Sequence, residues 1–126
     1  MFSHVMVGAD DIDAAKKFYD ACFIALGGRE GSVDPKGRVM YIKDGSIFIV
    51  TKPIDGQPAC HANGGTIGFA VDSVEMAEAW HAAGSANGGT EIEDPPGIRE
   101  GGGMQMHLAY LRDPAGNKVC TMMRMG

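Results

Sequence analysis

The chain has 126 residues, 44% of them hydrophobic, and a chain of this length buries the core of one ordinary domain without disulfide staples. With 16 acidic and 11 basic residues the net charge is −5, and the scattered lysines and arginines exclude the basic stripe of a nucleic-acid binder. The cysteines, Cys22, Cys60 and Cys120, form no CxxC pair, and no apolar run approaches the roughly 18 residues of a membrane helix. We therefore expect a cytoplasmic protein in a reducing compartment, without nucleic-acid or membrane partners.

The chain opens with a short apolar strand followed by a helix. Phe2 to Ala9 is rich in strand-forming residues, and Asp10 is expected to cap a helix whose apolar residues recur at spacings of three and four. Gly27-Gly28 ends this helix, because glycine takes the left-handed conformation without strain. Strands are expected at "REGSV" and on both sides of a hairpin turn at Asp44-Gly45. The first unit is thus predicted to be β-α-β-β-β.

The second half of the chain repeats the first. The matched positions are His4 with Thr66, Asp10 with Asp72, Phe18 with Trp80, and Gly27-Gly28 with Gly88-Gly89. Asp72 is expected to cap the second helix, and a second hairpin is expected around the turn "DPAGN". We predict one domain over residues 1–126, with module one at 1–52, a proline- and glycine-rich linker at 53–64, and module two at 65–126.

The repeat, the hairpin "LRDPAGNKV" and the opening "HVMVGADDIDAAKKFYDA" together resemble the glyoxalase, bleomycin-resistance and extradiol-dioxygenase superfamily, also called vicinal oxygen chelate proteins. The resemblance covers essentially the whole chain. It implies an α+β fold in which tandem β-α-β-β-β modules have curled mixed sheets that form a cup. It also implies a ligand site inside the cup and, commonly, a homodimer.

In the metal-dependent members, the resemblance implies ligands on the first and last strands of each module. His4 keeps the first of these positions, whereas the others are Ile49, Thr66 and Cys120, where Glu, His or Gln, and Glu are more usual. Isoleucine cannot bind a metal, a threonine hydroxyl is a weak ligand, and a catalytic zinc keeps three protein ligands. We therefore predict no metal and no other cofactor.

Two histidines are candidates for acid–base catalysis. His4 is either a pocket acid or base, or a strand histidine satisfied by a hydrogen bond. His107 would partly restore a His-His or His-Cys site if it faced the same side, and the sequence does not fix its face. Tyr110, which the repeat matches with Tyr41, either lines the pocket or is only a sheet residue.

The remaining pocket candidates each have a structural alternative. Cys120 is either a small hydrophobic residue or a thiol activated by a nearby cation, and Thr66 is either a strand former or a ligand-orienting hydroxyl. Arg99 lies with Glu100 in the loop from Gly97 to Gly103, which either closes over a ligand as a lid or is solvated. The predicted pocket residues are His4, Ile49, Thr66, Cys120, Tyr110 and Arg99.

Three functions remain open at this stage. The favoured one is a small-molecule binding or detoxification protein similar to the bleomycin-resistance branch, with a degenerate metal site. A metal-dependent lyase, isomerase or ring-cleaving dioxygenase is the alternative, although three of its four usual ligands are replaced. A metal-free enzyme would use His4 as general base with Cys120 or His107 assisting. We expect a homodimer, because strands such as "SIFIV" are apolar at successive positions and need cover on both faces.

Overall fold

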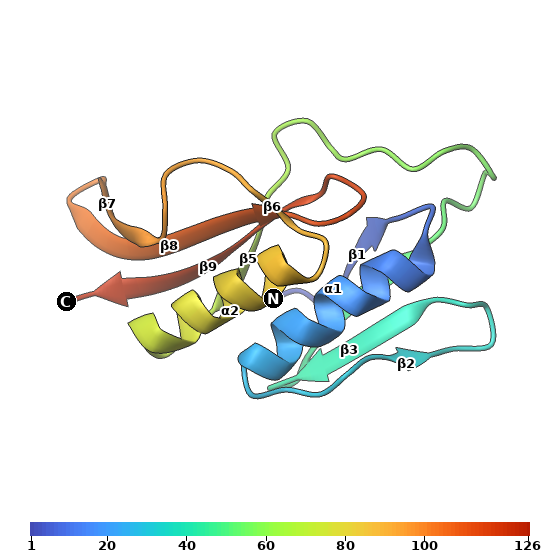
Figure 1. Cartoon of the computed structure of the whole chain (residues 1–126), viewed down its shortest axis with the longest axis horizontal. Helices are drawn as coiled ribbons and strands as arrows, with labels where there is room; N and C mark the ends of the chain where they lie inside the picture. Colours follow the sequence, from blue (N-terminus) through green and yellow to red (C-terminus); the bar gives the residue numbers. More distant parts are fainter.

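The computed structural model describes residues 1–126 and shows the predicted helices and strands in order, with one further strand at residues 97–101 (Figure 1). The elements are β1 (Val5–Gly8), α1 (Ile12–Ala25), β2 (Ser32–Val33), β3 (Val39–Lys43), β4 (Ser46–Thr51), β5 (Ile67–Ala70), α2 (Val74–Ala86), β6 (Thr90–Glu91), β7 (Gly97–Gly101), β8 (Met104–Arg112) and β9 (Lys118–Met125). No strand lies between Thr51 and Ile67. Neither helix is long and apolar enough to cross a membrane.

The strands form two mixed sheets with matching topology. Sheet A has the order β1-β4-β3-β2, and sheet B has the order β5-β9-β8-β6, with β7 also paired to β8. In each sheet the first strand runs parallel to the last, and the other pairs are antiparallel. The predicted α+β fold with a duplicated module is confirmed. The two sheets share no hydrogen-bonded strand pair and do not close a barrel.

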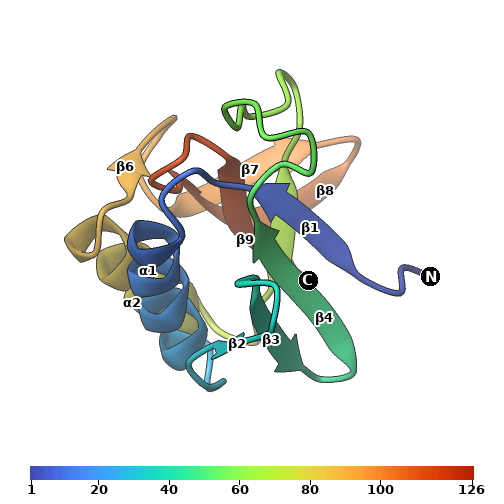
Figure 2. The ribbon, with the colours of Figure 1, turned by 90° about the vertical axis from the view of Figure 1, so that its right-hand side faces the viewer.

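Both helices lie on one side of the two sheets and contact each other (Figures 1 and 2). The matched residues Phe18 and Trp80 are fully buried in a single core cluster of 17 residues drawn from both modules. Gly84 permits the close approach of α2, because a Cβ there would lie 2.4 Å from the Leu111 side chain and 3.0 Å from Phe18. The core therefore occupies the space between the helices and the helix-facing sides of the sheets.

Each helix begins at a side chain that accepts a hydrogen bond from the backbone N–H three residues later. These caps are Asp11, at 3.0 Å, and Ser73, at 3.1 Å. The prediction that Asp10 and Asp72 form the caps is wrong by one residue in both modules. Asp10 instead accepts a hydrogen bond from the backbone N–H of Ala59 at 2.8 Å, which attaches the linker to module one.

The segment predicted as a glycine-rich loop contains a strand. Residues Gly97–Gly101 form β7, which pairs with β8 in register from Gly97 opposite Leu108 to Gly101 opposite Met104. The turn is made by Gly102 and Gly103, both with positive φ. Strand pairing uses main-chain groups and needs no particular side chain, so the glycine-rich composition gave no sign of this strand. Module two therefore has one strand more than module one, and Arg99 lies on a paired strand rather than a lid.

The turn "DPAGN" of module two forms hydrogen bonds with module one. The buried Asp113 carboxylate accepts hydrogen bonds from the Tyr19 hydroxyl of α1 at 2.7 Å and from the backbone N–H groups of Ala115 and Asn117. The Asn117 side-chain amide donates to Asp113 and to the Gly8 carbonyl of β1, both at 2.9 Å. The motif that most resembles the family pattern thus holds the modules together.

Candidate functional site

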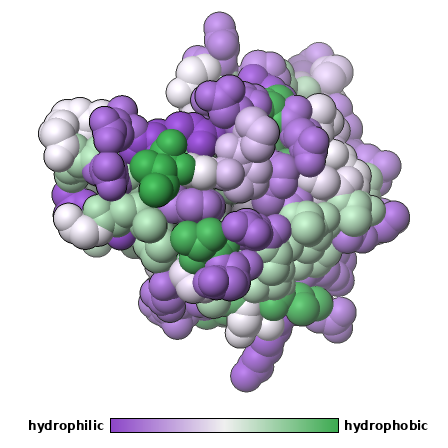
Figure 3. Space-filling model, turned by 60° about the vertical axis from the view of Figure 1, so that its left-hand side comes forward, coloured by the Kyte–Doolittle hydropathy of each residue, from purple (hydrophilic) through white to green (hydrophobic).

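Each sheet has a face toward the helices and an opposite face, which we call the outer face. Side chains alternate between the two faces along a strand. Residues in step with core residues such as Phe48 and Val119 point toward the helices and have what we call the inner parity, and the residues between them have the outer-face parity. The outer faces carry exposed apolar side chains, among them Met6 at 40%, Ile42 at 66% and Met122 at 42%. Figure 3 shows separate apolar patches among polar side chains on the side that carries β7 and the C-terminus.

Four of the six predicted pocket residues, Ile49, Cys120, Tyr110 and Arg99, lie on strands with the outer-face parity. Ile49 lies opposite Met6 in sheet A, and Cys120 lies between Gly68 and Tyr110 in sheet B. His4 and Thr66 directly precede β1 and β5, and Arg99 lies opposite Met106 on β7. The paired registers also make Ile49 and Cys120 equivalent positions of the two modules, as the sequence match assumed.

The two edge strands β1 and β5 border two cavities. One, of about 340 Å³, is lined by His4 and Val5 of module one, all four residues of β5, and core aromatic residues such as Phe23. The other, of about 300 Å³, is lined by Met6, Thr66 and Lys118, together with part of the linker. Both volumes lie at the lower end of the range for small-molecule pockets. The predicted residues therefore do not converge on one cavity within the chain.

His4 is exposed, and its Nδ1 lies 2.8 Å from the Ser3 hydroxyl. The positions equivalent to the remaining metal ligands offer poor donors. Ile49 has none and Thr66 has a neutral hydroxyl, whereas Cys120 is a buried thiol whose pKa burial raises to about 11. No group of three or more His, Cys, Asp or Glu side chains in the chain is placed to hold a metal ion. These residues do not fit the metal site implied by the family pattern.

The polar part of the site lies on sheet B, around Tyr110. The Lys118 ammonium lies 4.9 Å from the centre of the Tyr110 ring and forms an ion pair with Glu93. Burial, with help from Cys120 and Glu93, raises the pKa of the Tyr110 hydroxyl, whereas Lys118 and Arg99 oppose the shift. Phenol, ammonium and guanidinium groups therefore lie close together on one face, where they can bind an organic anion.

His107 has the inner parity, opposite Met123 and Ile98, and is 4% exposed. Its Nδ1 has no hydrogen-bond partner. This placement separates it from Cys120, so nothing in the geometry supports the predicted catalytic role of His107. The match of Tyr41 with Tyr110 is wrong by one residue, because Tyr41 pairs with the core residue Phe48 and points inward, whereas Tyr110 points outward.

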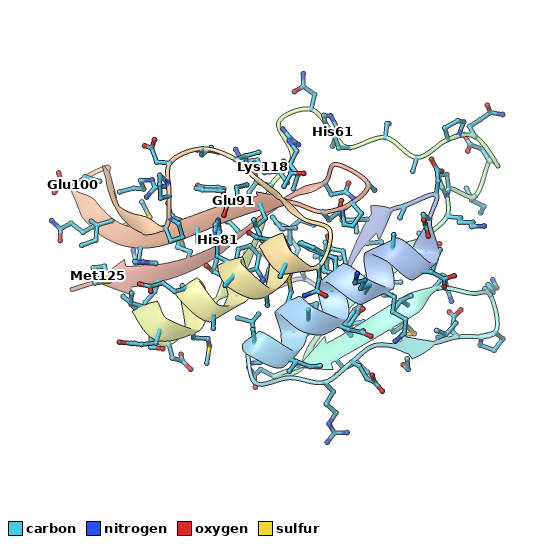
Figure 4. The ribbon with its side chains drawn as sticks, in the orientation of Figure 1. His61, His81, Glu91, Glu100, Lys118 and Met125 are labelled. Carbon is cyan, nitrogen blue, oxygen red and sulfur yellow. The ribbon has the colours of Figure 1, made fainter.

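Two further histidines lie away from the outer faces. In Figure 4, His81 of α2 lies beside Glu91 of β6, and His81 Nδ1 is 3.9 Å from a Glu91 carboxylate oxygen. His61 lies on the linker, with Lys118 nearby on β9 (Figure 4). Lys118, Glu93 and Arg112 were not predicted as pocket residues from the sequence. Lys118 and Arg112 share the strand parity of Cys120 and Tyr110, which is the signal that identifies their face.

A family model described as Glyoxalase/Bleomycin resistance protein/Dioxygenase superfamily matches residues 1–121. The chain belongs to this superfamily. It is similar to a glyoxalase/bleomycin resistance protein from Albidiferax ferrireducens, with 52% identity over 97% of this chain and 98% of that one, and a TM-score of 0.93. The resemblance inferred from the repeat and the "LRDPAGNKV" hairpin is therefore confirmed. A search of curated proteins found no match.

Solved structures of lower sequence identity share the fold. A lactoylglutathione lyase from Agrobacterium tumefaciens is 23% identical, with a TM-score of 0.64 and coverage of 97% of this chain and 92% of that one. A fosfomycin resistance protein from Mesorhizobium loti is 11% identical, with a TM-score of 0.68 and coverage of 98% and 91%. At these identities the likeness concerns the fold alone, so the superfamily establishes the scaffold and the chemistry must be argued from this chain's side chains.

Proposed function

We propose that this superfamily member is a small-molecule binding or detoxification protein whose ligand lies on the outer faces of the sheets, without a metal ion. The observation that carries the proposal is the set of residues at the four matched positions: His4, Ile49, Thr66 and Cys120. Ile49 has no donor atom and Thr66 has only a neutral hydroxyl, so His4 and Cys120 remain, which is fewer than the three protein ligands of a catalytic zinc. The surrounding apolar side chains, with a few polar groups on sheet B, suit an organic ligand.

A second chain is the natural cover for the rest of these faces. Exposed large apolar side chains such as Ile42 and Met6 lie on sheet A without cover from the helices, and contiguous patches of this kind mark interfaces. We therefore propose a homodimer. The ligand is enclosed either by outer faces of two chains or by the outer faces of the two modules of one chain. Binding in this arrangement depends on shape and polar contacts rather than on metal coordination.

The proposal is tested by titrating chelator-treated protein with Zn²⁺, Ni²⁺, Mn²⁺ and Fe²⁺, and by screening organic ligands with and without EDTA. We expect less than one equivalent of each metal and ligand-induced thermal stabilisation that EDTA leaves unchanged. His4→Ala is the matched variant, because it removes the one familiar ligand position. One equivalent of tightly bound metal that is lost in His4→Ala would overturn the proposal. That result would favour the hypothesis of a metal-dependent lyase or dioxygenase.

A further inference from the structure

The duplication gives the chain two equivalent outer faces, and their side chains differ systematically. The strand registers define the equivalent pairs, which are Met6 and Gly68, Met40 and Tyr110, Ile42 and Arg112, Ile47 and Lys118, and Ile49 and Cys120. Every member from module one is a large apolar residue. The members from module two are two cations, a phenol, a thiol and a glycine. One fold therefore presents an apolar face on sheet A and a polar, basic face on sheet B.

The basic character of sheet B runs along its outer face. Four basic side chains have this parity: Arg99, Arg112, Lys118 and Arg124. Only Lys118 forms an ion pair, with Glu93, and none of the three arginines pairs with a carboxylate. The whole chain carries a net charge of −5, so this face has the sign opposite to that of the molecule. Unpaired cations on a half-buried surface attract an anion.

Backbone contacts hold two of these cations without neutralising them. Arg99 donates to the carbonyl of Asp94 at 2.8 Å, and Arg112 donates to the carbonyl of Gly116 at 2.7 Å. Their positive charges therefore remain available to a ligand, and their side chains lose little further freedom when one binds. The glutamate partner of Lys118 is a partly exposed loop residue, so an incoming anion competes with it for the ammonium group.

The two faces meet at the cavity of about 300 Å³ beside β1 and β5. Met6 lines this cavity from the apolar face and Lys118 lines it from the basic face, and Thr66 also belongs to the lining. At the neighbouring position on sheet B, Gly68 has no side chain, and even a Cβ would lie 3.3 Å from Cys120 Sγ. The Cys120 thiol therefore lies close to the backbone of β5, at the position where module one has Met6.

We propose that the ligand is an amphipathic anion. Its carboxylate, sulfonate or phosphate group is bound by Lys118 and Arg99 beside Tyr110, and its apolar body lies against the outer face of sheet A around Met6 and Ile49. This inference rests on the proposed function, since it names the ligand class of the same site. Charge-assisted hydrogen bonds from lysine and arginine supply the selectivity for the anion, and burial of apolar surface supplies the rest of the affinity.

Two fluorescent probes with the same apolar body test the inference. 8-Anilinonaphthalene-1-sulfonate carries an anionic group, and N-phenyl-1-naphthylamine lacks it. We expect the sulfonate to bind at least about tenfold more tightly, because each hydrogen bond to a charged group contributes roughly one factor of ten or more. Lys118→Gln and Arg99→Gln should each weaken binding of the sulfonate and leave binding of the neutral probe unchanged. Arg29→Gln is the matched control, since Arg29 is exposed, forms no ion pair and lies outside this face.

The outcomes separate the two proposals. Near-UV circular dichroism first verifies that each variant keeps the native fold, because the sulfonate probe also binds loosened cores. Equal affinity for both probes, or equal losses in Arg29→Gln and Lys118→Gln, would overturn the anionic ligand class while leaving a small-molecule site in place. If neither probe binds the native protein, both the ligand class and the proposed function fail.

Discussion

Replacement of Asp113 by alanine is the substitution that tests the link between the modules most severely. The Asp113 carboxylate is 2% exposed and accepts hydrogen bonds from Tyr19, Ala115 and Asn117. The Tyr19 hydroxyl lies in the core, where burial first and Asp113 second raise the pKa of the phenol well above its usual range. It therefore stays protonated and needs an acceptor. Asp113→Ala would leave this buried donor without a partner.

The magnitude follows from these contacts. A hydrogen bond to a charged group contributes roughly 1.5 to 3 kcal/mol, and an unsatisfied buried donor costs roughly 1 to 3 kcal/mol. Asp113 serves both the Tyr19 hydroxyl and two backbone groups of the turn, so we expect the free energy of unfolding to fall by about 3 to 5 kcal/mol. The loss is large for a domain of this size, and the Asp113→Ala variant should unfold at a much lower urea concentration than the native protein.

Urea unfolding followed by fluorescence of Trp80, the single tryptophan, measures this difference. Asp55→Ala is the matched control, because Asp55 also accepts a hydrogen bond from a turn, from Gln57 N at 3.0 Å, but is exposed in the linker. The control should change the free energy of unfolding by less than about 0.5 kcal/mol. A loss within about 1 kcal/mol in Asp113→Ala would refute the reasoning that this turn holds the two modules together.

Three further outcomes follow from the structure. In the native protein an aromatic disulfide reagent should modify the exposed Cys60 quickly at pH 8 and the buried Cys22 and Cys120 only slowly. Burial raises the pKa of the Cys22 thiol to about 12 and that of the Cys120 thiol to about 11. Fast modification of all three would contradict this burial. Burial of Asp20 is outweighed by hydrogen bonds from Gly31 N, the Lys16 ammonium and the Tyr41 hydroxyl, which lower the carboxyl pKa, so its stabilising contribution is complete above the ordinary value of 3.8 and is lost as pH falls below it. Asp20→Asn should flatten that part of the stability profile in acid urea titrations, and an unchanged slope would count against the network. Light scattering at micromolar concentration should give twice the chain mass of 13.3 kDa, and a monomer would remove the proposed dimer.

The fold was predictable because its signals are local and repeated. The apolar spacing around Phe18 recurs around Trp80, and glycine pairs end both helices, so one module predicted the other. The caps were wrong by one residue because Asp10 and Asp11 are both good capping residues, and only the linker contact to Asp10 decides between them. Strand β7 was missed because its pairing with β8 depends on backbone geometry that glycine neither demands nor forbids.

The candidate site was predictable in residue type but not in orientation. The parity of Ile49 and Cys120 followed from the duplication, since equivalent strands place equivalent residues on the same face. The sequence did not fix the face of His107, and the match of Tyr41 with Tyr110 by turn residues was shifted by one. The basic face around Lys118 depends on the pairing of β7, β8 and β9, which the sequence does not specify.

The central claim is that a ligand binds the outer faces of the sheets without a metal ion. A ¹H–¹⁵N nuclear magnetic resonance titration of chelator-treated protein with 8-anilinonaphthalene-1-sulfonate tests it most directly. We expect shifts concentrated at Thr66, Gly68, Tyr110 and Cys120, of equal size with and without added Zn²⁺. Shifts that appear only after Zn²⁺ is added, or that centre on inner-face positions such as His107, would contradict the account.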